Sequence, residues 1–198
     1  ALYQRLQLSV TFANEFIRLT DENTDPEYVI YNAEARFLRA LAYSWAIDLF
    51  GQFPFTTEED GIGKFFPKIG TRDEIFNYVE AELLEIQDLL GEPGSSYPQA
   101  DKAAAWMLLA KIYLNAEVYT GTAMWEECIT YCDKVEASGM YSLNPDYRHN
   151  FTADNHYSAN NEMIFAWEQD GTHSQGWVGT TFIIQSSSDD TYLPSEDY

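Results

Sequence analysis

The spacing of apolar residues from Glu27 to Phe50 limits what this chain can fold into more than any other feature. Apolar side chains recur there at alternating steps of four and three residues, which is the period of one helix face. Phe37 and Leu41 widen that face, so the predicted helix must pack on more than one neighbour. Gly51 follows directly and predicts a C-cap. The stripe consists of Tyr31, Ala35, Leu38, Ala42, Trp45 and Leu49.

The same period predicts four further helices, over residues 2–19, 71–90, 101–118 and 123–138. Thr71 and Glu74 have the spacing of a capping box at the start of the second of these. In the last helix we expect one face to point inward. That face carries Trp125, Cys128, Ile129, Cys132 and Val135. We interpret the two cysteines, four residues apart, as buried small apolar residues, since this spacing suits a disulfide poorly.

The predicted helices form antiparallel pairs with short or medium connections, and a weak repeat of roughly 34 residues is typical of tetratricopeptide units. Such units cannot bury their apolar faces alone, so they stack. We therefore predict a mainly α fold of tetratricopeptide-like pairs, an α/α superhelix, over residues 1–141. Residues 142–198 are expected to form an incomplete, loop-rich region with short strands. The strand candidates are Met163–Trp167 and Thr180–Gln185.

Charge and motifs exclude several classes of function. The 32 acidic residues outnumber the 11 Lys and Arg residues and give a net charge of −21, which argues against a nucleic-acid partner. The sequence has no nucleophile elbow, phosphate loop or zinc-protease motif. The histidines, His149, His156 and His173, lie in predicted loops without the helical spacing of metal ligands. We predict no catalytic residue, no metal site and no cofactor, and the chain is interpreted as a non-enzyme.

Several segments, in order, resemble the SusD/RagB family. Residues 34–43 (EARFLRALAY), followed by Asp48-Leu49-Phe50-Gly51 and Pro54, look like the most recognisable helix of the family and its exit. Residues 100–105 (ADKAAA) and 108–114 (LLAKIYL) are similar to a second family helix. Two later segments also match family positions: Glu162-Met163-Ile164-Phe165 and the turn Gln169-Asp170-Gly171. The turn looks closest to the starch-binding branch.

The resemblance implies a location, partners and a function. It implies a glycan-binding lipoprotein of the outer membrane, lipid-anchored at the cell surface, that takes part in nutrient uptake. Its partners would be an oligosaccharide, bound without cleavage, and a SusC-like TonB-dependent transporter that the helical half contacts. Members of the family are much longer than this chain, so we expect a fragment that lacks the anchor and part of the binding face.

Trp177 is the first candidate for sugar contact, because it lies in the glycine-rich segment Gly176-Trp177-Val178-Gly179. Its position resembles that of a loop tyrosine in the aromatic arc of the starch-binding branch. His173 and Gln175 share the loop and are candidates for hydrogen bonds to sugar hydroxyls. The alternatives are that Trp177 folds back onto the core and that the other two are ordinary loop residues. Core packing is expected for the other tryptophans, Trp45, Trp106, Trp125 and Trp167.

A second interpretation of the whole chain stays open. It could be a tetratricopeptide-type scaffold whose concave face holds a protein partner and binds no sugar. Such a scaffold does not need an exposed tryptophan in a late loop, so the exposure of Trp177 separates the two interpretations.

Overall fold

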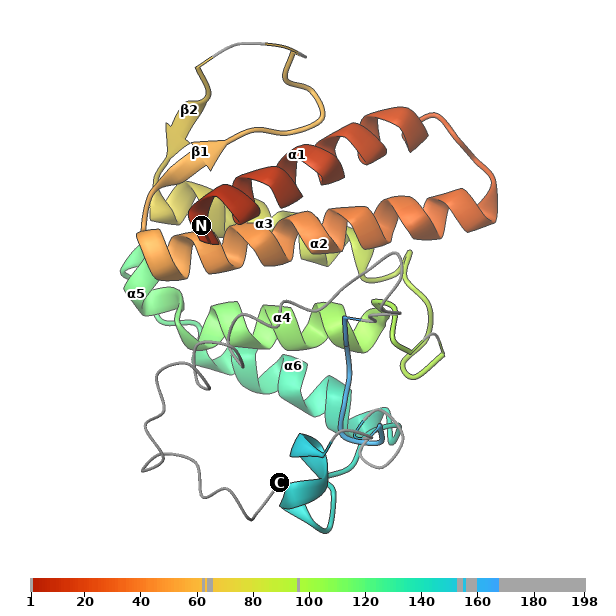
Figure 1. Cartoon of the computed structure of the whole chain (residues 1–198). Helices are drawn as coiled ribbons and strands as arrows, with labels where there is room; N and C mark the ends of the chain where they lie inside the picture. The colour runs from red at the N-terminus through yellow and green to blue at the C-terminus, as the bar shows by residue number, and fades with distance from the viewer. Residues whose placement is uncertain are drawn as a thin grey trace, which may run out of the picture. The chain divides into compact units, whose positions relative to one another are not determined.

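The structure is a computed structural model that describes residues 2–61, 63, 66–95, 97–152, 155 and 160–167. Its helices confirm the predicted mainly α fold (Figure 1). No helix in this described part is long and apolar enough to cross a membrane. The elements are α1 (Leu2–Thr20), α2 (Pro26–Phe50), β1 (Phe53–Phe55), β2 (Lys68–Gly70), α3 (Arg72–Ile86), α4 (Lys102–Leu114), α5 (Ala116–Thr120), α6 (Trp125–Ala137) and the 3-10 helix η1 (Tyr147–Phe151).

The long helix α2 lies at the centre of the fold and has the ends that the sequence predicts. Asp25 is its N-cap and accepts a hydrogen bond from the backbone N–H of Glu27, while Pro26 occupies the first turn. Gly51 ends the helix with a φ of 78°, a conformation that favours glycine, and donates its N–H to the carbonyl of Ile47. Figure 1 shows α1 packed along α2 as an antiparallel pair, with α3 behind the pair and α4 on the side of α2 away from α1.

The core lies between these layers and is built from α1, α2, α3 and α4. The face of α3 that meets the core carries Phe76, Val79, Leu83 and Ile86, all buried, and Leu90 is buried just beyond the end of the helix. The stripe predicted for α2 is only partly correct. Ala35 and Ala42 are buried, but Trp45 and Leu49 are exposed, and the residues that fill the core instead are Phe37, Ala40, Tyr43 and Ile47. Because α2 is apolar over much of its circumference, periodicity alone did not fix which side faces the core.

The inward face predicted for α6 is only partly correct, since Cys128 packs against the core and Val135 is partly buried. Trp125 and Ile129 are more than half exposed and Cys132 is exposed, while Cys128 is half-buried. The side of α6 that meets α4 instead carries Tyr131, whose ring lies 5.8 Å from that of Tyr113. Since α6 packs mainly on the single neighbour α4, only a narrow strip of its surface is covered.

Core packing is also wrong for most of the tryptophans. Trp45, Trp125 and Trp167 have exposed fractions of 37%, 58% and 61%. Trp106 alone among the four is partly buried against the core, and its indole N–H donates to Gln87 Oε1 at 3.1 Å.

Two further expectations are corrected in detail. The helix predicted over residues 101–118 is interrupted at Asn115, whose φ of −104° and ψ of 9° separate α4 from α5. Met163–Trp167 forms no strand, and the backbone N–H of Ala166 bonds to the carbonyl of Pro98. Ile164 and Phe165 pack on the helical core, so burial of side chains, rather than a strand ladder, holds this segment.

The long connection between α2 and α3 contains a hairpin that the sequence did not predict. β1 pairs with β2 in antiparallel register, Phe53 opposite Gly70. Phe53 enters the core beside Tyr3, with ring centroids 4.8 Å apart, and Phe55 packs at its edge. A Cβ at Gly70 would lie 2.8 Å from the Ile75 side chain, so this position needs glycine for close approach. The loop between β1 and β2 lies against α1, where Arg18 donates to the carbonyl of Glu58.

Thr71→Ala is expected to destabilise the protein by about 1 kcal/mol, because it removes the N-cap of α3. The Thr71 side chain accepts from the backbone N–H of Glu74, and the Glu74 carboxylate accepts from that of Thr71, which confirms the predicted capping box. Urea unfolding checks the value. Thr71→Ser keeps the hydroxyl and should restore most of the loss, and an equal loss in both variants would contradict the capping role.

The described residues between 142 and 166 lie within the same compact unit as the helices. Phe165 stacks edge-on against Phe37 of α2, with ring centroids 5.3 Å apart. The division into regions 1–141 and 142–198 remains a prediction.

Candidate functional site

The residues predicted to touch sugar, Trp177, His173 and Gln175, lie outside the described residues, as do Gln169, Asp170 and the second strand candidate, Thr180–Gln185. Their role therefore stays a prediction. The described residues offer a cleft beside α1, a buried charge network, an apolar groove and an exposed aromatic turn.

The cleft lies between α1 and the loop that follows β1, and its volume is about 380 Å³. Arg18 spans it, since its guanidinium donates to the carbonyls of Glu58 (2.9 Å) and Asp60 (3.1 Å). Asn14, on the inner wall, donates to the hydroxyl of Thr56 at 3.2 Å. These bonds tie α1 to the loop, and they place a few amide, hydroxyl and guanidinium groups in a cleft whose lining is otherwise mostly apolar.

A buried charge network centred on Arg39 of α2 lies behind the cleft. Its side chain is fully buried and donates to Glu82 Oε2 and Asn14 Oδ1, both at 2.8 Å, and it pairs with Glu58. Its guanidinium carbon also lies 5.5 Å from the centre of the Tyr78 ring. A buried cation is tolerated only with such partners. The network therefore joins α1, α2, α3 and the loop after β1.

The electrostatics of this network favour ion pairs rather than proton transfer. Burial opposes ionisation of Glu82, but hydrogen bonds from Arg36 and Arg39 outweigh it and lower the pKa of that carboxyl. Burial raises the pKa of the Tyr78 phenol, with the Glu82 and Glu58 carboxylates adding to it against the opposing field of Arg39. A carboxylate held ionised and a phenol held neutral are poor general acids and bases near neutral pH. We interpret the network as structural.

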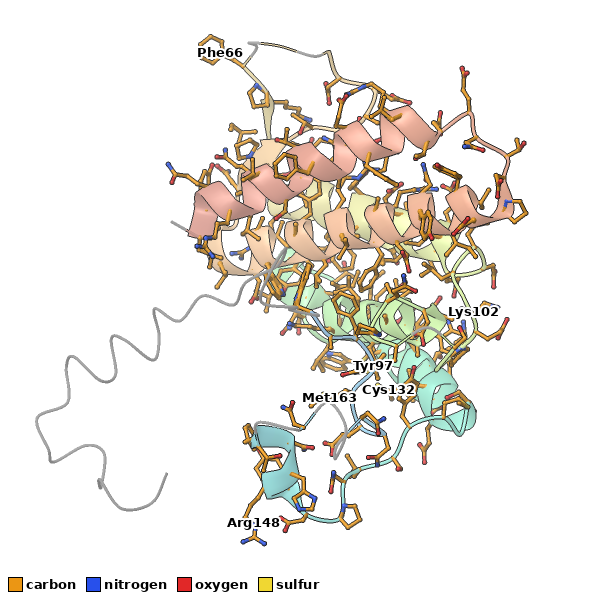
Figure 2. The ribbon with its side chains drawn as sticks, turned by 45° about the vertical axis from the view of Figure 1, so that its right-hand side comes forward. Phe66, Tyr97, Lys102, Cys132, Arg148 and Met163 are labelled. Carbon is orange, nitrogen blue, oxygen red and sulfur yellow. The ribbon has the colours of Figure 1, made fainter. Side chains whose placement is uncertain are left out.

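The apolar groove runs between α2, α4, α6 and the segment that ends at Phe165, with a volume of about 420 Å³. Its lining is almost wholly apolar, and Cys132, labelled in Figure 2, lies on its α6 wall. The residues that contribute most of the lining are Phe37, Leu41, Met107, Leu108, Ile164 and Phe165.

The exposed aromatic turn is η1, within the loop-rich region. Tyr147 and Phe151 are both 71% exposed, and their ring centroids lie 5.1 Å apart at 65°. Asp146 caps the turn by accepting the backbone N–H of Arg148 at 3.1 Å. This pair was not predicted from the sequence, although two aromatic residues four apart in a polar segment were the available signal.

Metal binding has no support among the residues that the structure describes, where no three His, Cys, Asp or Glu side chains gather. The described histidine, His149, is half exposed and lies 4.0 Å from the Asp146 carboxylate.

Comparison with known proteins gives two curated relatives, while no family model matches the chain. The starch-binding protein SusD of Bacteroides thetaiotaomicron is 37% identical over 186 residues, which are 92% of this chain and 33% of SusD. The SusD-like protein P25 of Formosa agariphila is 29% identical over 153 residues, which are 74% of this chain and 28% of that protein. The chain thus spans about a third of the length of the curated relatives it matches.

Comparison with solved structures agrees on the fold. A laminarin-binding SusD-like protein matches with a TM-score of 0.74 and 19% identity, over 89% of this chain and 39% of that one. The tetratricopeptide-like arrangement of the helices is therefore that of solved SusD-like proteins.

Proposed function

We propose that this chain, which is SusD-like over nearly its whole length, belongs to a protein that captures oligosaccharides at the cell surface. The resemblance to the SusD/RagB family is confirmed by the 37% identity to SusD, and this is the observation that carries the proposal. One relative is named for starch binding and one structural neighbour for laminarin binding, so a carbohydrate is the ligand class that they share.

The proposed mechanism is capture by stacking and hydrogen bonds, with no bond broken. Trp177 would stack on the apolar face of a pyranose, with His173 and Gln175 donating to or accepting from its hydroxyls. The Arg39 network indirectly supports binding without cleavage. Its described carboxylates are paired with arginines, so they are not placed to act as catalytic acids or bases.

Replacing Trp177 by Ala is expected to weaken oligosaccharide binding about tenfold, because losing a good aromatic contact costs on the order of 1 kcal/mol or more. Calorimetric titration of the natural protein that carries this sequence, against starch-type and other oligosaccharides, measures the effect. Trp125→Ala is the matched control, since Trp125 is an exposed tryptophan on α6. A Trp177→Ala protein that stays folded and binds as tightly as the wild type would remove Trp177 from the site.

We further propose that the captured oligosaccharide passes to a SusC-like TonB-dependent transporter, and that the protein is lipid-anchored on the outer membrane. Both statements rest on the resemblance. Affinity purification of the natural protein from detergent-solubilised outer membranes tests them, because the transporter should co-purify in a fixed ratio. Recovery of the protein alone, or from the soluble fraction, contradicts this part.

One observation favours the alternative of a protein-binding scaffold. The apolar groove beside Cys132 is of a kind that interfaces use, since a contiguous exposed apolar surface marks interaction sites. If no oligosaccharide binds while a protein partner does, the scaffold interpretation replaces the glycan-binding one.

A further inference from the structure

We propose that the aromatic turn η1 is a second sugar-contacting site, in which Tyr147 and Phe151 stack against an oligosaccharide. This inference rests on the proposed function and adds residues to it that neither the sequence analysis nor the resemblance singles out. Both rings are 71% exposed, although burying each would be favourable. An exposed pair of rings in contact with each other is a surface that a ligand can cover.

Polar interactions, rather than burial of the rings, hold the turn in place. The Glu162 carboxylate accepts from the backbone N–H of Asn144 at 2.7 Å and from the Asn150 amide at 3.1 Å. These bonds lower the pKa of Glu162, so the carboxylate stays ionised near neutral pH. The Asn155 amide donates to the carbonyl of Asn150 at 2.8 Å, beside the end of the turn. The backbone is thus fixed by groups other than the rings, which favours a preorganised binding surface.

The polar groups beside the rings suit a saccharide. The Asp146 carboxylate holds the Arg148 guanidinium through two bonds, Nε to Oδ1 at 3.0 Å and Nη2 to Oδ2 at 2.6 Å. The Arg148 side chain is 87% exposed, so its remaining N–H donors face solvent. His149 is half exposed in the same turn. Rings with oriented donors next to them offer both the apolar face and the hydrogen bonds that a pyranose requires.

The angle between the rings favours one shape of ligand. With 65° between their planes, the two free faces point in different directions. An oligosaccharide that turns from one sugar to the next can place successive pyranoses on both ring faces. A flat, β-linked oligosaccharide can stack on only one of the two rings. A starch-type oligosaccharide is therefore the appropriate probe.

Titration of the natural protein with maltohexaose tests the site. Tyr147→Ala and Phe151→Ala should each weaken binding several-fold, up to about tenfold. Tyr147→Phe keeps the ring and should bind nearly as well as the wild type. Phe66→Ala is the control, because Phe66 is an exposed aromatic residue too and lies at the opposite end of the described residues from Arg148 (Figure 2).

A second measurement does not depend on removing a ring. With fluorotyrosine at Tyr147, saturating maltohexaose should shift the fluorine resonance. A wild-type protein that binds maltohexaose, with no shift and unchanged binding in both Ala variants, overturns the second site and leaves the proposed function standing. A wild-type protein that binds no saccharide overturns the proposed function itself, and the second site with it.

Discussion

Arg39→Met is expected to destabilise the protein by about 3–5 kcal/mol, because it removes one partner from a buried ion-pair network. The Arg39 side chain is fully buried and bonds to Glu82, Glu58 and Asn14. Without the guanidinium, Glu82 remains beneath the surface with a side chain only 12% exposed and one fewer cation beside it. Methionine fills a similar volume, so most of the loss is electrostatic. Equilibrium unfolding in urea, followed by circular dichroism, measures the change.

Two further variants separate this effect from a general loss of charge. Lys68→Met breaks the exposed pair of Lys68 with Glu74, 2.6 Å apart, and should cost at most about 1 kcal/mol. The double variant Arg39→Met with Glu82→Gln should recover part of the loss, because it also removes the carboxylate that would keep only Arg36 as a partner. An Arg39→Met protein as stable as Lys68→Met would contradict the structural role of the network.

The same network predicts sensitivity to acid. The pKa of Glu82 is lower in the folded protein than its ordinary value of about 4.3. At pH values between the folded and the unfolded pKa of Glu82, the unfolded chain therefore binds more protons than the folded protein. The stability that Glu82 contributes is therefore fully present above about pH 4.3 and is lost as the pH falls through the folded value. Glu82→Gln should reduce this dependence in urea unfolding measured across the acidic range.

Phe76→Ala is expected to cost about 3–5 kcal/mol, because it leaves a cavity in the centre of the core. Phe76 has no exposed surface, and its ring lies 6.1 Å from that of Tyr119 and 6.4 Å from that of Tyr113. It thus joins α3 to α4 and α5, and its loss should loosen all three. Differential scanning calorimetry and urea unfolding should both show the change.

Phe12→Ala is the matched control for Phe76→Ala. Phe12 is 65% exposed on α1, and its loss should change stability by no more than about 0.5 kcal/mol. Equal losses for the two variants would contradict the placement of the core between α2, α3 and α4.

The sequence predicts the helices well because their signals are local. The capping box of Thr71 and the Gly51 C-cap of α2 each act within a few residues, and both are confirmed. The covered face of a helix depends instead on its neighbours. Trp125 and Ile129 have a good periodic pattern, yet they are exposed because α4 covers another side of α6.

The candidate sites were less predictable for the same reason. From the sequence alone, Arg39 looks like an ordinary charged residue on the exposed face of a helix. Its partner Glu82 lies 43 residues away. Nothing local joins the two. Tyr147 and Phe151 lie in a polar segment, and the short turn they form is held by hydrogen bonds to Glu162. Glu162 follows Tyr147 by 15 residues and Phe151 by 11. Trp177, His173 and Gln175 stay a prediction.

The most direct test of the central claim is a calorimetric titration of the natural protein with maltohexaose, followed by analysis of the recovered sugar by mass spectrometry. We predict saturable binding and recovery of intact maltohexaose. An absence of binding to maltohexaose and to other oligosaccharides would contradict glycan capture, and recovery of shorter products would contradict binding without cleavage.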